Sequence, residues 1–456
     1  LREHPSTYSY ACPPARRSPD VMPPWALFVL RLHAVLSVIP SSAELASRMG
    51  LCNKQRQWGK TLDLYHAACH SNASMNAACY VEAMRAHGSR GEASQALDAF
   101  HAMQARGHKA TVVTYTCAIR SCATRLHWPI ALSLLDDLRS DGIIPDIRCL
   151  NAVLSACERG GQWDEANMLL QAMLDGEEES LPRPDTISFN TVISAASRGT
   201  NWLLALQLLN SMGSTADSYS FTAAMSACER AGENERALDL LKRMQEAGVA
   251  PTVVTYNVAI RACATATLWP IALSLLHDME SDGLTPNVIS FNAALAACER
   301  GRQWQEADML LAEMEDRRIL PDATSMHTAI SACRRAENRR SAARAVALLQ
   351  QMRRRGLRTS LVGYTTVMNA LSTVGYWRGA VAVFSRLQAS HTPDVVALQT
   401  ALGACAKGAR WEDALRILAL MRQPDRTALF LAADACYAAG QTDMASQLIE
   451  QADHVM

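Results

Sequence analysis

The chain has 456 residues, of which 49% are hydrophobic, 19% charged and 6% aromatic. Lys plus Arg and Asp plus Glu each number 44, so the net charge of zero excludes no class of partner, and a basic surface has to come from where the charges lie. The 14 cysteines include no CxxC pair, which argues against a zinc knuckle, and their number argues against an oxidised, secreted protein.

Residues 1–41 differ in composition from the rest of the chain. Seven prolines prevent a long regular element, and arginines outnumber acidic residues. The apolar run at residues 25–39 is interrupted and falls short of the ~20 residues of a membrane span. Two interpretations stay open, a targeting peptide and a helix that caps the array that follows.

From residue 42 to residue 456 the sequence repeats with a period close to 35. The stretch Thr111–Met173 returns almost intact at Pro251–Met314, and each copy contains two similar repeats. A fixed period in this range indicates a solenoid. We place twelve repeat starts, at Ser42, Ala77, Val112, Ile147, Thr186, Ser218, Val253, Val288, Ala323, Leu361, Val395 and Arg426.

Each repeat is predicted to form two antiparallel helices. In the repeat at 112, Tyr115, Ile119 and Cys122 give a first helix its apolar stripe at three- and four-residue steps. Trp128 and the proline after it begin a second helix, because proline is tolerated in the first helical turn. Such a pair cannot bury its apolar stripes alone, so each pair has to stack on the next.

Two columns of the aligned repeats are interpreted as packing positions. The eleventh place is cysteine at residues 52, 122, 157, 228, 263, 298, 333, 405 and 436. The seventeenth place is tryptophan at residues 58, 128, 163, 202, 269, 304, 377 and 411. Metal or redox chemistry for the cysteines and base stacking for the tryptophans are the alternatives.

Two further columns are polar. The last place of a repeat holds only Asn, Asp, Ser or Thr, which are strong helix N-cap residues, although a cap side chain can also face a ligand. The fifth place holds short polar residues that change from repeat to repeat, whereas a packing position would stay uniform. This variation favours readout of a variable ligand over a solvated helix face. The thirteenth place is basic in seven repeats and predicts phosphate contacts, with solvated surface charge as the alternative: Lys54, Arg159, Arg198, Arg230, Arg300, Arg335 and Lys407.

The chain resembles the pentatricopeptide repeat (PPR) family. The resemblance lies in VVTYNVAI at residues 253–260, in helix pairs of period 35 and in the closing Pro-Asp or Pro-Asn of a repeat. It implies an all-α fold, a right-handed superhelical α-solenoid of antiparallel helix pairs with about 12 repeats. It also implies binding of single-stranded RNA with one base per repeat.

The resemblance assigns roles to three columns. The fifth and last places would read the base through the pairs Thr116 and Asp146, Asn151 and Asp185, Asn190 and Asp217, Thr222 and Thr252, Asn257 and Asn287, Asn292 and Asp322, and Thr365 and Asp394. The second place would lie between successive bases, at Val113, Ile187, Val254, Ile289, Val362 and Val396. The implied target, 5′ to 3′ along the repeats from 112 to 361, is G-U-U-purine-pyrimidine-U-N-G.

The expected function is sequence-specific binding of single-stranded RNA in organelle RNA metabolism, in a plastid or a mitochondrion. The sequence has no HxE with a later CxxC and no Gly-rich phosphate loop, so we expect neither an enzyme nor a cofactor or metal. We expect no membrane and no small-molecule substrate as a partner, while other RNA-processing proteins are further candidates. The alternative is a helical scaffold that binds proteins or peptides in its groove.

Overall fold

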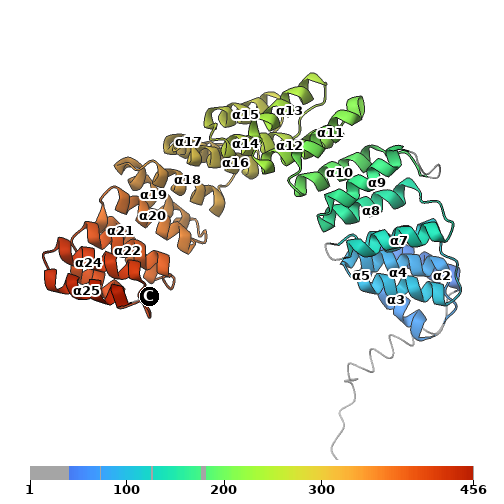
Figure 1. Cartoon of the computed structure of the whole chain (residues 1–456), viewed down its shortest axis with the longest axis horizontal. Helices are drawn as coiled ribbons and strands as arrows, with labels where there is room; N and C mark the ends of the chain where they lie inside the picture. Colours follow the sequence, from blue (N-terminus) through green and yellow to red (C-terminus); the bar gives the residue numbers. More distant parts are fainter. Residues whose placement is uncertain (1–40, 72, 125–126, 176–180, 455–456) are drawn as a thin grey trace, which may run out of the picture. The chain divides into compact units, whose positions relative to one another are not determined.

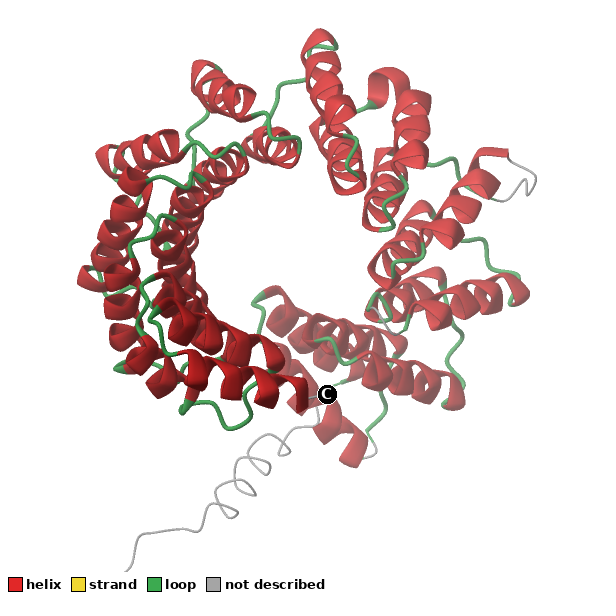
Figure 2. Cartoon of the chain, turned by 60° about the vertical axis from the view of Figure 1, so that its left-hand side comes forward, coloured by secondary structure: helices red, strands yellow, loops and turns green. Residues whose placement is uncertain are grey.

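The computed structural model describes residues 41–71, 73–124, 127–175 and 181–454, so the predicted targeting peptide or capping helix lies outside it except for Ser41. The described residues form 24 α-helices and no strand, which confirms an all-α repeat solenoid. Figure 1 draws the helix pairs in chain order, and Figure 2 shows helices joined by loops. The right-handed superhelical path stays a prediction.

The helices alternate between a first and a second helix of each repeat. The first helices are α2 (Ser42–Lys54), α4 (Ala77–Arg90), α6 (Val112–Ser121), α8 (Ile147–Gly160), α10 (Thr186–Arg198), α12 (Ser218–Ala231), α14 (Val253–Thr265), α16 (Val288–Arg300), α18 (Ala323–Arg335), α20 (Leu361–Thr373), α22 (Val395–Lys407) and α24 (Arg426–Ala438). The second helices are α3 (Trp58–His70), α5 (Ala93–Ala105), α7 (Trp128–Ser140), α9 (Trp163–Asp175), α11 (Trp202–Met212), α13 (Asn234–Glu246), α15 (Trp269–Ser281), α17 (Trp304–Asp316), α19 (Arg339–Arg354), α21 (Trp377–Gln388), α23 (Trp411–Leu418) and α25 (Thr442–His454). A short 3-10 helix, η1 (Gly213–Thr215), follows α11. Each first helix begins at the residue where the sequence places a repeat start.

The chain divides into two compact parts, which we describe separately. The first part contains α2 to α8, and the second contains α9 to α25. Within each part, consecutive first helices pack side by side, as α4 does on α6 and α14 does on α16. The second helices pack mainly on the first helices of their own and of the following repeat. In Figure 1, α12, α14 and α16 lie in one row and α13, α15 and α17 in another.

The core consists of small and aromatic residues at fixed places of the repeat. The fourth-place rings of Tyr115, Tyr256, Phe291 and Tyr364 are at most 1% exposed. Eight of the nine eleventh-place cysteines are buried, and burial raises the thiol pKa of seven of them, for example to about 12 for Cys298. These thiols are therefore protonated and inert at neutral pH, in agreement with a packing role.

The seventeenth-place tryptophans are half-buried packing residues. Several of these rings lie against a glycine at the C-terminal end of the following first helix, as Trp128 does on Gly160 and Trp377 on Gly408. A Cβ added at Gly160 would lie 2.5 Å from Trp128 Cδ1, and one at Gly408 would lie 2.6 Å from the Trp377 ring. Only glycine permits this close approach, which agrees with packing and not with base stacking. None of the helices in the described ranges is long and apolar enough to cross a bilayer.

Candidate nucleic-acid interface

The last residue of each repeat caps the first helix of the next. The side chains of all eleven accept a hydrogen bond from a backbone N–H of the first turn, as Asp217 Oδ1 does from Ser220 N at 2.8 Å. The predicted N-cap role therefore holds for this whole column. It also fixes the position of each last-place side chain at the junction between two repeats.

Two predicted base-reading pairs lie in direct contact across such a junction. Asn190 Nδ2 donates to Asp217 Oδ1 at 3.2 Å, and Asn292 Nδ2 donates to Asp322 Oδ1 at 3.4 Å. Asn190 is only 8% exposed, which is deeper than a solvated helix face would place it. Its surroundings are the polar cap of the next helix, so the amide is buried against hydrogen-bonding groups.

A serine at the third place of the following repeat completes these junctions, and the sequence analysis did not assign it a role. Ser220 Oγ lies 2.5 Å from Asn190 Oδ1, and Ser325 Oγ lies 2.6 Å from Asn292 Oδ1. Ser220 is fully buried, and its hydroxyl also accepts from Asp217 N at 3.2 Å. The hydroxyl therefore holds the asparagine oxygen on one side while the aspartate holds its nitrogen. The recurrence of Ser or Thr at residues 114, 188, 220, 255, 290 and 325 was the available signal.

Asn257 is arranged differently, although a serine, Ser290, also occupies the third place of its following repeat. It is 6% exposed, and its Oδ1 is buried without a hydrogen-bond partner. The serine that would hold it, Ser290, instead donates to Asn287 Oδ1 at 3.2 Å. A buried acceptor without a partner costs about 1–3 kcal/mol.

The fifth-place threonines direct their hydroxyls mainly to their own helix. Thr116 Oγ1 donates to Val112 O at 2.7 Å, and Thr365 Oγ1 donates to Val362 O at 3.0 Å. Among the described side chains, neither has a hydrogen bond to its predicted last-place partner. Thr222 is different, because its hydroxyl lies 2.8 Å from Thr255 Oγ1, which in turn contacts Thr252.

Other junctions show how the fifth and third places are matched. His327 Nε2 lies 3.3 Å from Ser360 Oγ, and the next third place is Gly363. A Cβ added at Gly363 would lie 2.7 Å from His327 Nε2, so the glycine makes room for the imidazole. Gln399 Nε2 reaches past a third-place alanine to Asp425 Oδ2 at 2.7 Å. Asn151 and Asp185 belong to the two different compact parts, and their pairing stays a prediction.

The last-place aspartates Asp217 and Asp322 are charged at neutral pH. Burial alone would raise the pKa of Asp217, but hydrogen bonds from the backbone and hydroxyl of Ser220 and from the Asn190 amide lower it below its ordinary value. The same opposing effects, with Ser325 and Asn292 as donors, lower the pKa of Asp322. These side chains therefore present hydrogen-bond acceptors only.

The second-place apolar residues are exposed beside these junctions. All six predicted positions have exposed fractions between 54% and 70%: Val113, Ile187, Val254, Ile289, Val362 and Val396. A seventh member of the column, Tyr219, is 56% exposed and was not assigned from the sequence. Exposed side chains of this size have no role in the core and leave apolar surface available to a ligand.

The seven thirteenth-place basic residues are exposed, but most also have a partner within the protein. Four donate to the carbonyl oxygen near the end of the preceding first helix: Arg159 to Ala123 O at 3.0 Å, Arg230 to Ser197 O at 3.5 Å, Arg300 to Ala264 O at 3.3 Å and Lys407 to Ser372 O at 2.9 Å. Arg335 pairs with Glu299 at 3.1 Å. Cations are favourable at helix C-termini, so packing alone gives this column a reason to be basic. Their phosphate contacts stay a prediction.

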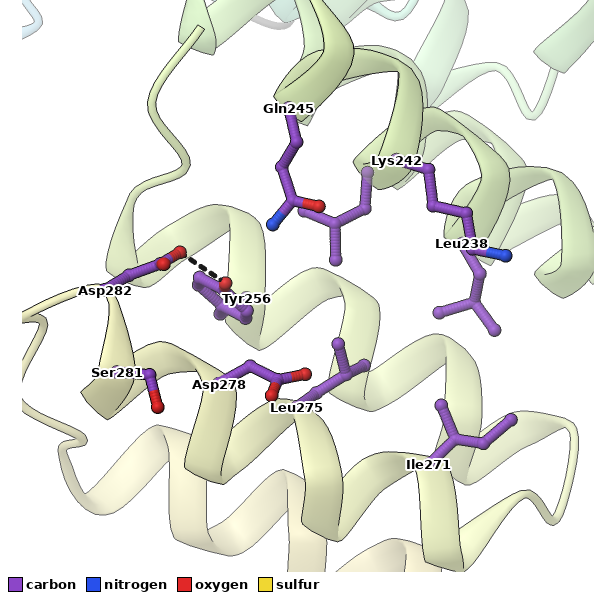
Figure 3. Close-up of a pocket in the computed structure, with 10 residues that line it drawn as sticks. Leu238, Lys242, Gln245, Tyr256, Ile271, Leu275, Asp278, Ser281 and Asp282 are labelled. Carbon is purple, nitrogen blue, oxygen red and sulfur yellow. Dashed lines mark hydrogen bonds between the residues drawn. The ribbon is translucent and has the colours of Figure 1, made fainter. Parts of the chain in front are cut away.

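One hollow of about 480 Å³ lies away from these junctions, between the second helices α13 and α15 (Figure 3). Tyr256 at its edge donates to Asp282 Oδ2 at 2.6 Å, and Lys242, Gln245 and Asp278 also line it. It contains none of the predicted site residues. Across the described ranges, no three His, Cys, Asp or Glu side chains are grouped so that they could hold a metal ion.

Comparison with known proteins gives matches along most of the array. The pentatricopeptide repeat domain matches residues 98–159, 274–343 and 347–408, the PPR repeat family matches residues 216–265, and the PPR repeat matches residues 148–176 and 254–284. Together these matches cover more than half of the chain.

Two relatives from maize illustrate the similarity. Pentatricopeptide repeat-containing protein 10, chloroplastic, is 32% identical over 131 residues, which are 29% of this chain and 12% of that protein. The crystal structure of the maize pentatricopeptide repeat protein PPR10 has a TM-score of 0.58 at 21% identity, covering 95% of this chain and 68% of that one, and shows the fold. A structure of PPR10 in complex with an 18-nt psaJ RNA element has a TM-score of 0.44. From the matched repeats, the chain belongs to the pentatricopeptide repeat family.

Proposed function

We propose that this protein binds single-stranded RNA in a sequence-specific manner, with one base at each repeat junction. The proposal rests on family membership, because PPR repeats read one base per helical repeat. The observation that carries it is the recurring junction itself. Each places an exposed apolar side chain beside a polar fifth-place side chain and a cap residue, and repeats this arrangement along both compact parts.

In this proposal a base lies between the second-place side chains of two consecutive repeats. Ile289 and its counterparts supply apolar surface for the faces of the base. The edge of the base then meets the fifth-place side chain, as at Asn292. Contact between an apolar side chain and the face of a base tolerates any base. Discrimination between bases therefore has to come from the polar contacts to the base edge.

The cap residue selects among bases according to whether its side chain accepts or donates a hydrogen bond. A charged aspartate such as Asp217 accepts only, which favours a base whose ring nitrogen carries a proton, uracil or guanine. An asparagine cap such as Asn287 can also donate, which admits bases whose ring nitrogen accepts. We propose that Asn190 with Asp217 and Asn292 with Asp322 face uracil, and that Asn257 with Asn287 faces a pyrimidine.

The unpaired oxygen of Asn257 supports the same assignment. A buried amide oxygen without a partner would be satisfied by the amino group of cytosine or the ring N–H of uracil. Binding then recovers the 1–3 kcal/mol that the free protein loses at this atom. The remaining pairs follow the predicted target, with guanine at the junctions of Thr116 and Thr365, uracil at that of Asn151 and a purine at that of Thr222.

We include the thirteenth-place cations as phosphate contacts. A guanidinium has five N–H donors, so Arg159 and Arg300, each with one bond to a carbonyl, keep donors for a phosphate. If all seven side chains act, log affinity falls with log salt with a slope of about −5, from ~0.7 per phosphate on single strands.

The test is a change of base preference at one junction. Asn190→Thr, with Asp217 retained, should shift preference at the facing base from uracil towards guanine and leave the other positions unchanged. Binding is measured by fluorescence anisotropy with RNAs that differ at that base alone. Equal weakening for every RNA would show that the fifth place does not read bases. Binding of peptides but not of RNA would favour the protein-scaffold alternative.

We propose that the array acts by occupying RNA, masking it from nucleases, remodelling it or placing a partner protein on it, without a reaction of its own. A plastid or mitochondrion is the proposed location. The maize relative is named as a chloroplastic protein, and this supports an organelle. Imaging a fluorescent fusion of the full reading frame tests the location.

A further inference from the structure

The strongest charge asymmetry of the chain lies in a single repeat. Residues 334–358 contain nine arginines, one acidic residue (Glu337) and no lysine, in a chain whose total charge is zero. The second helix of this repeat, α19, has five arginines among its 16 residues and no acidic residue. We call Arg334, Arg335, Arg339 and Arg340 the turn cluster, because they flank the turn between α18 and α19.

Packing does not explain the turn cluster. Arg339 occupies the seventeenth place, where eight repeats have the tryptophan that packs on the next first helix. Arg339 and Arg340 are exposed, and Arg334 is half-buried. With Arg339 in place of tryptophan, this repeat lacks the aromatic packing contact and has two solvated guanidinium groups, those of Arg339 and Arg340, at this point.

Helix electrostatics disfavour the same positions. Arg339 and Arg340 lie in the first turn of α19, at the positive end of the helix dipole. A cation there is unfavourable by about 0.3–1 kcal/mol, and the neighbouring like charges of Arg334 and Arg335 add to this repulsion. By contrast, Arg353 and Arg354 lie in the last turn of α19, where the dipole favours cations. The structure therefore explains the second pair but not the first.

Internal ion pairs do not account for the cluster either. Arg335 pairs with Glu299, and Arg344, further along α19, pairs with Asp308 at 2.6 Å. Among the described residues, Arg334, Arg339 and Arg340 have no ion pair or hydrogen bond from their side chains. Arg339 and Arg340 lie at an unfavourable helix end, and Arg334 joins them from the last turn of α18. The three guanidinium groups at one turn indicate an anionic partner that the chain itself does not supply.

The chemistry favours a phosphodiester backbone as this partner. Arginine's planar fork binds phosphate oxygens through two parallel hydrogen bonds, and the stretch uses arginine alone. A membrane surface is a poorer fit, because no large apolar side chain is exposed between residues 334 and 358 to enter the lipid. Arg334 lies seven residues beyond His327 along α18, or about 10 Å at 1.5 Å per residue.

We propose that the turn cluster is a phosphate-binding site for the backbone of the bound RNA, separate from the base-reading junctions. The inference rests on the proposed RNA-binding function. Such a site adds affinity independent of sequence and anchors the strand at the repeat that begins at residue 323. Because His327 departs from the family's base-reading pairs, a backbone contact here holds the strand where base readout is unusual.

The test compares two double variants of the full chain. Arg339→Gln with Arg340→Gln removes two cluster charges, and Arg353→Gln with Arg354→Gln removes two equally exposed charges from the other end of the same helix. Affinity for an RNA carrying the predicted target is measured at 50 and 200 mM salt. With ~0.7 per phosphate, the wild type should lose about sevenfold more affinity over this range than the cluster variant. The control variant should behave like the wild type, and base preference at Asn190 should be unchanged in both.

An unchanged salt dependence in the cluster variant would overturn the site, and so would an equal change in both variants. Binding to vesicles that contain phosphatidylglycerol and, separately, to an acidic peptide is measured in parallel. If the cluster variant loses binding to one of these probes but not to RNA, the assignment to RNA is overturned. If the wild type, with its helical circular dichroism intact, binds no RNA, the proposed function itself fails. If the wild type binds RNA and only the cluster prediction fails, the base-reading junctions are untouched.

Discussion

The third-place serine offers a sharp test of how the junctions work. Ser220 holds the oxygen of the Asn190 amide while Asp217 holds its nitrogen, so the free protein keeps the amide in one orientation. Ser220→Ala removes the hydroxyl and leaves the cap residue and the reading residue in place. We expect the asparagine to lose its fixed orientation and the repeat to discriminate less well between uracil and cytosine.

The magnitude follows from the hydrogen bond that is lost. A bond worth ~1 kcal/mol favours one of two amide orientations by about fivefold. Losing it should therefore lower the uracil-to-cytosine ratio of Kd values by up to about fivefold. Stability should fall by about 1–2 kcal/mol, because Asp217 N loses its acceptor while alanine gains slightly in helix propensity.

Ser290→Ala is the matched control. Ser290 is as buried as Ser220 and accepts from Asn287 N at 3.2 Å, but its hydroxyl has no hydrogen bond to Asn257. Its removal should lower stability by a similar amount in urea denaturation and leave base preference at the Asn257 junction unchanged. Equal loss of discrimination in the two variants, or none in Ser220→Ala, would refute the idea that the hydroxyl orients the reading side chain.

Three further predictions concern close contacts and protonation. Gly363→Ala should move the His327 imidazole and change base preference at that repeat, measured by anisotropy, at nearly constant stability, because alanine gains ~1 kcal/mol in a helix. Gly301→Ala should cost about 1–3 kcal/mol in urea denaturation by overpacking against Trp269, whereas Gly403→Ala, whose Cβ meets nothing, should stabilise. Burial lowers the pKa of His327 from 6.5, so the unfolded chain binds more protons. Stability should therefore fall as pH drops below 6.5, and thermal unfolding of His327→Gln should lack this component.

The sequence was sufficient for the repeat frame, because period, caps and helix starts are local properties. Trp128 begins a helix and Asp217 caps one, as their neighbours in sequence indicate. The junction chemistry was harder to predict, since it depends on the distance between repeats. That Ser325 meets Asn292 while Ser290 misses Asn257 is not visible in residues of the same type at the same spacing.

The basic residues illustrate a second limit of the sequence. A periodic arginine at the end of a first helix suits a carbonyl of the preceding helix as well as a phosphate, and periodicity cannot separate the two. Arg159 shows the first use in the structure. The turn cluster was not predicted, because Arg334, Arg339 and Arg340 lie outside the periodic column and the net charge of the chain is zero.

The N-cap position has a consequence for changing the specificity of this protein. Each last-place residue that precedes a further repeat caps a helix, so any redesign that alters it also alters the stability of the following repeat. Asn, Asp and Ser cap almost equally well and Thr only slightly less, while alanine costs about 1 kcal/mol. Retargeting within these four side chains is therefore nearly free of a folding penalty. The need to cap a helix therefore limits which residue types this position tolerates, independently of RNA binding.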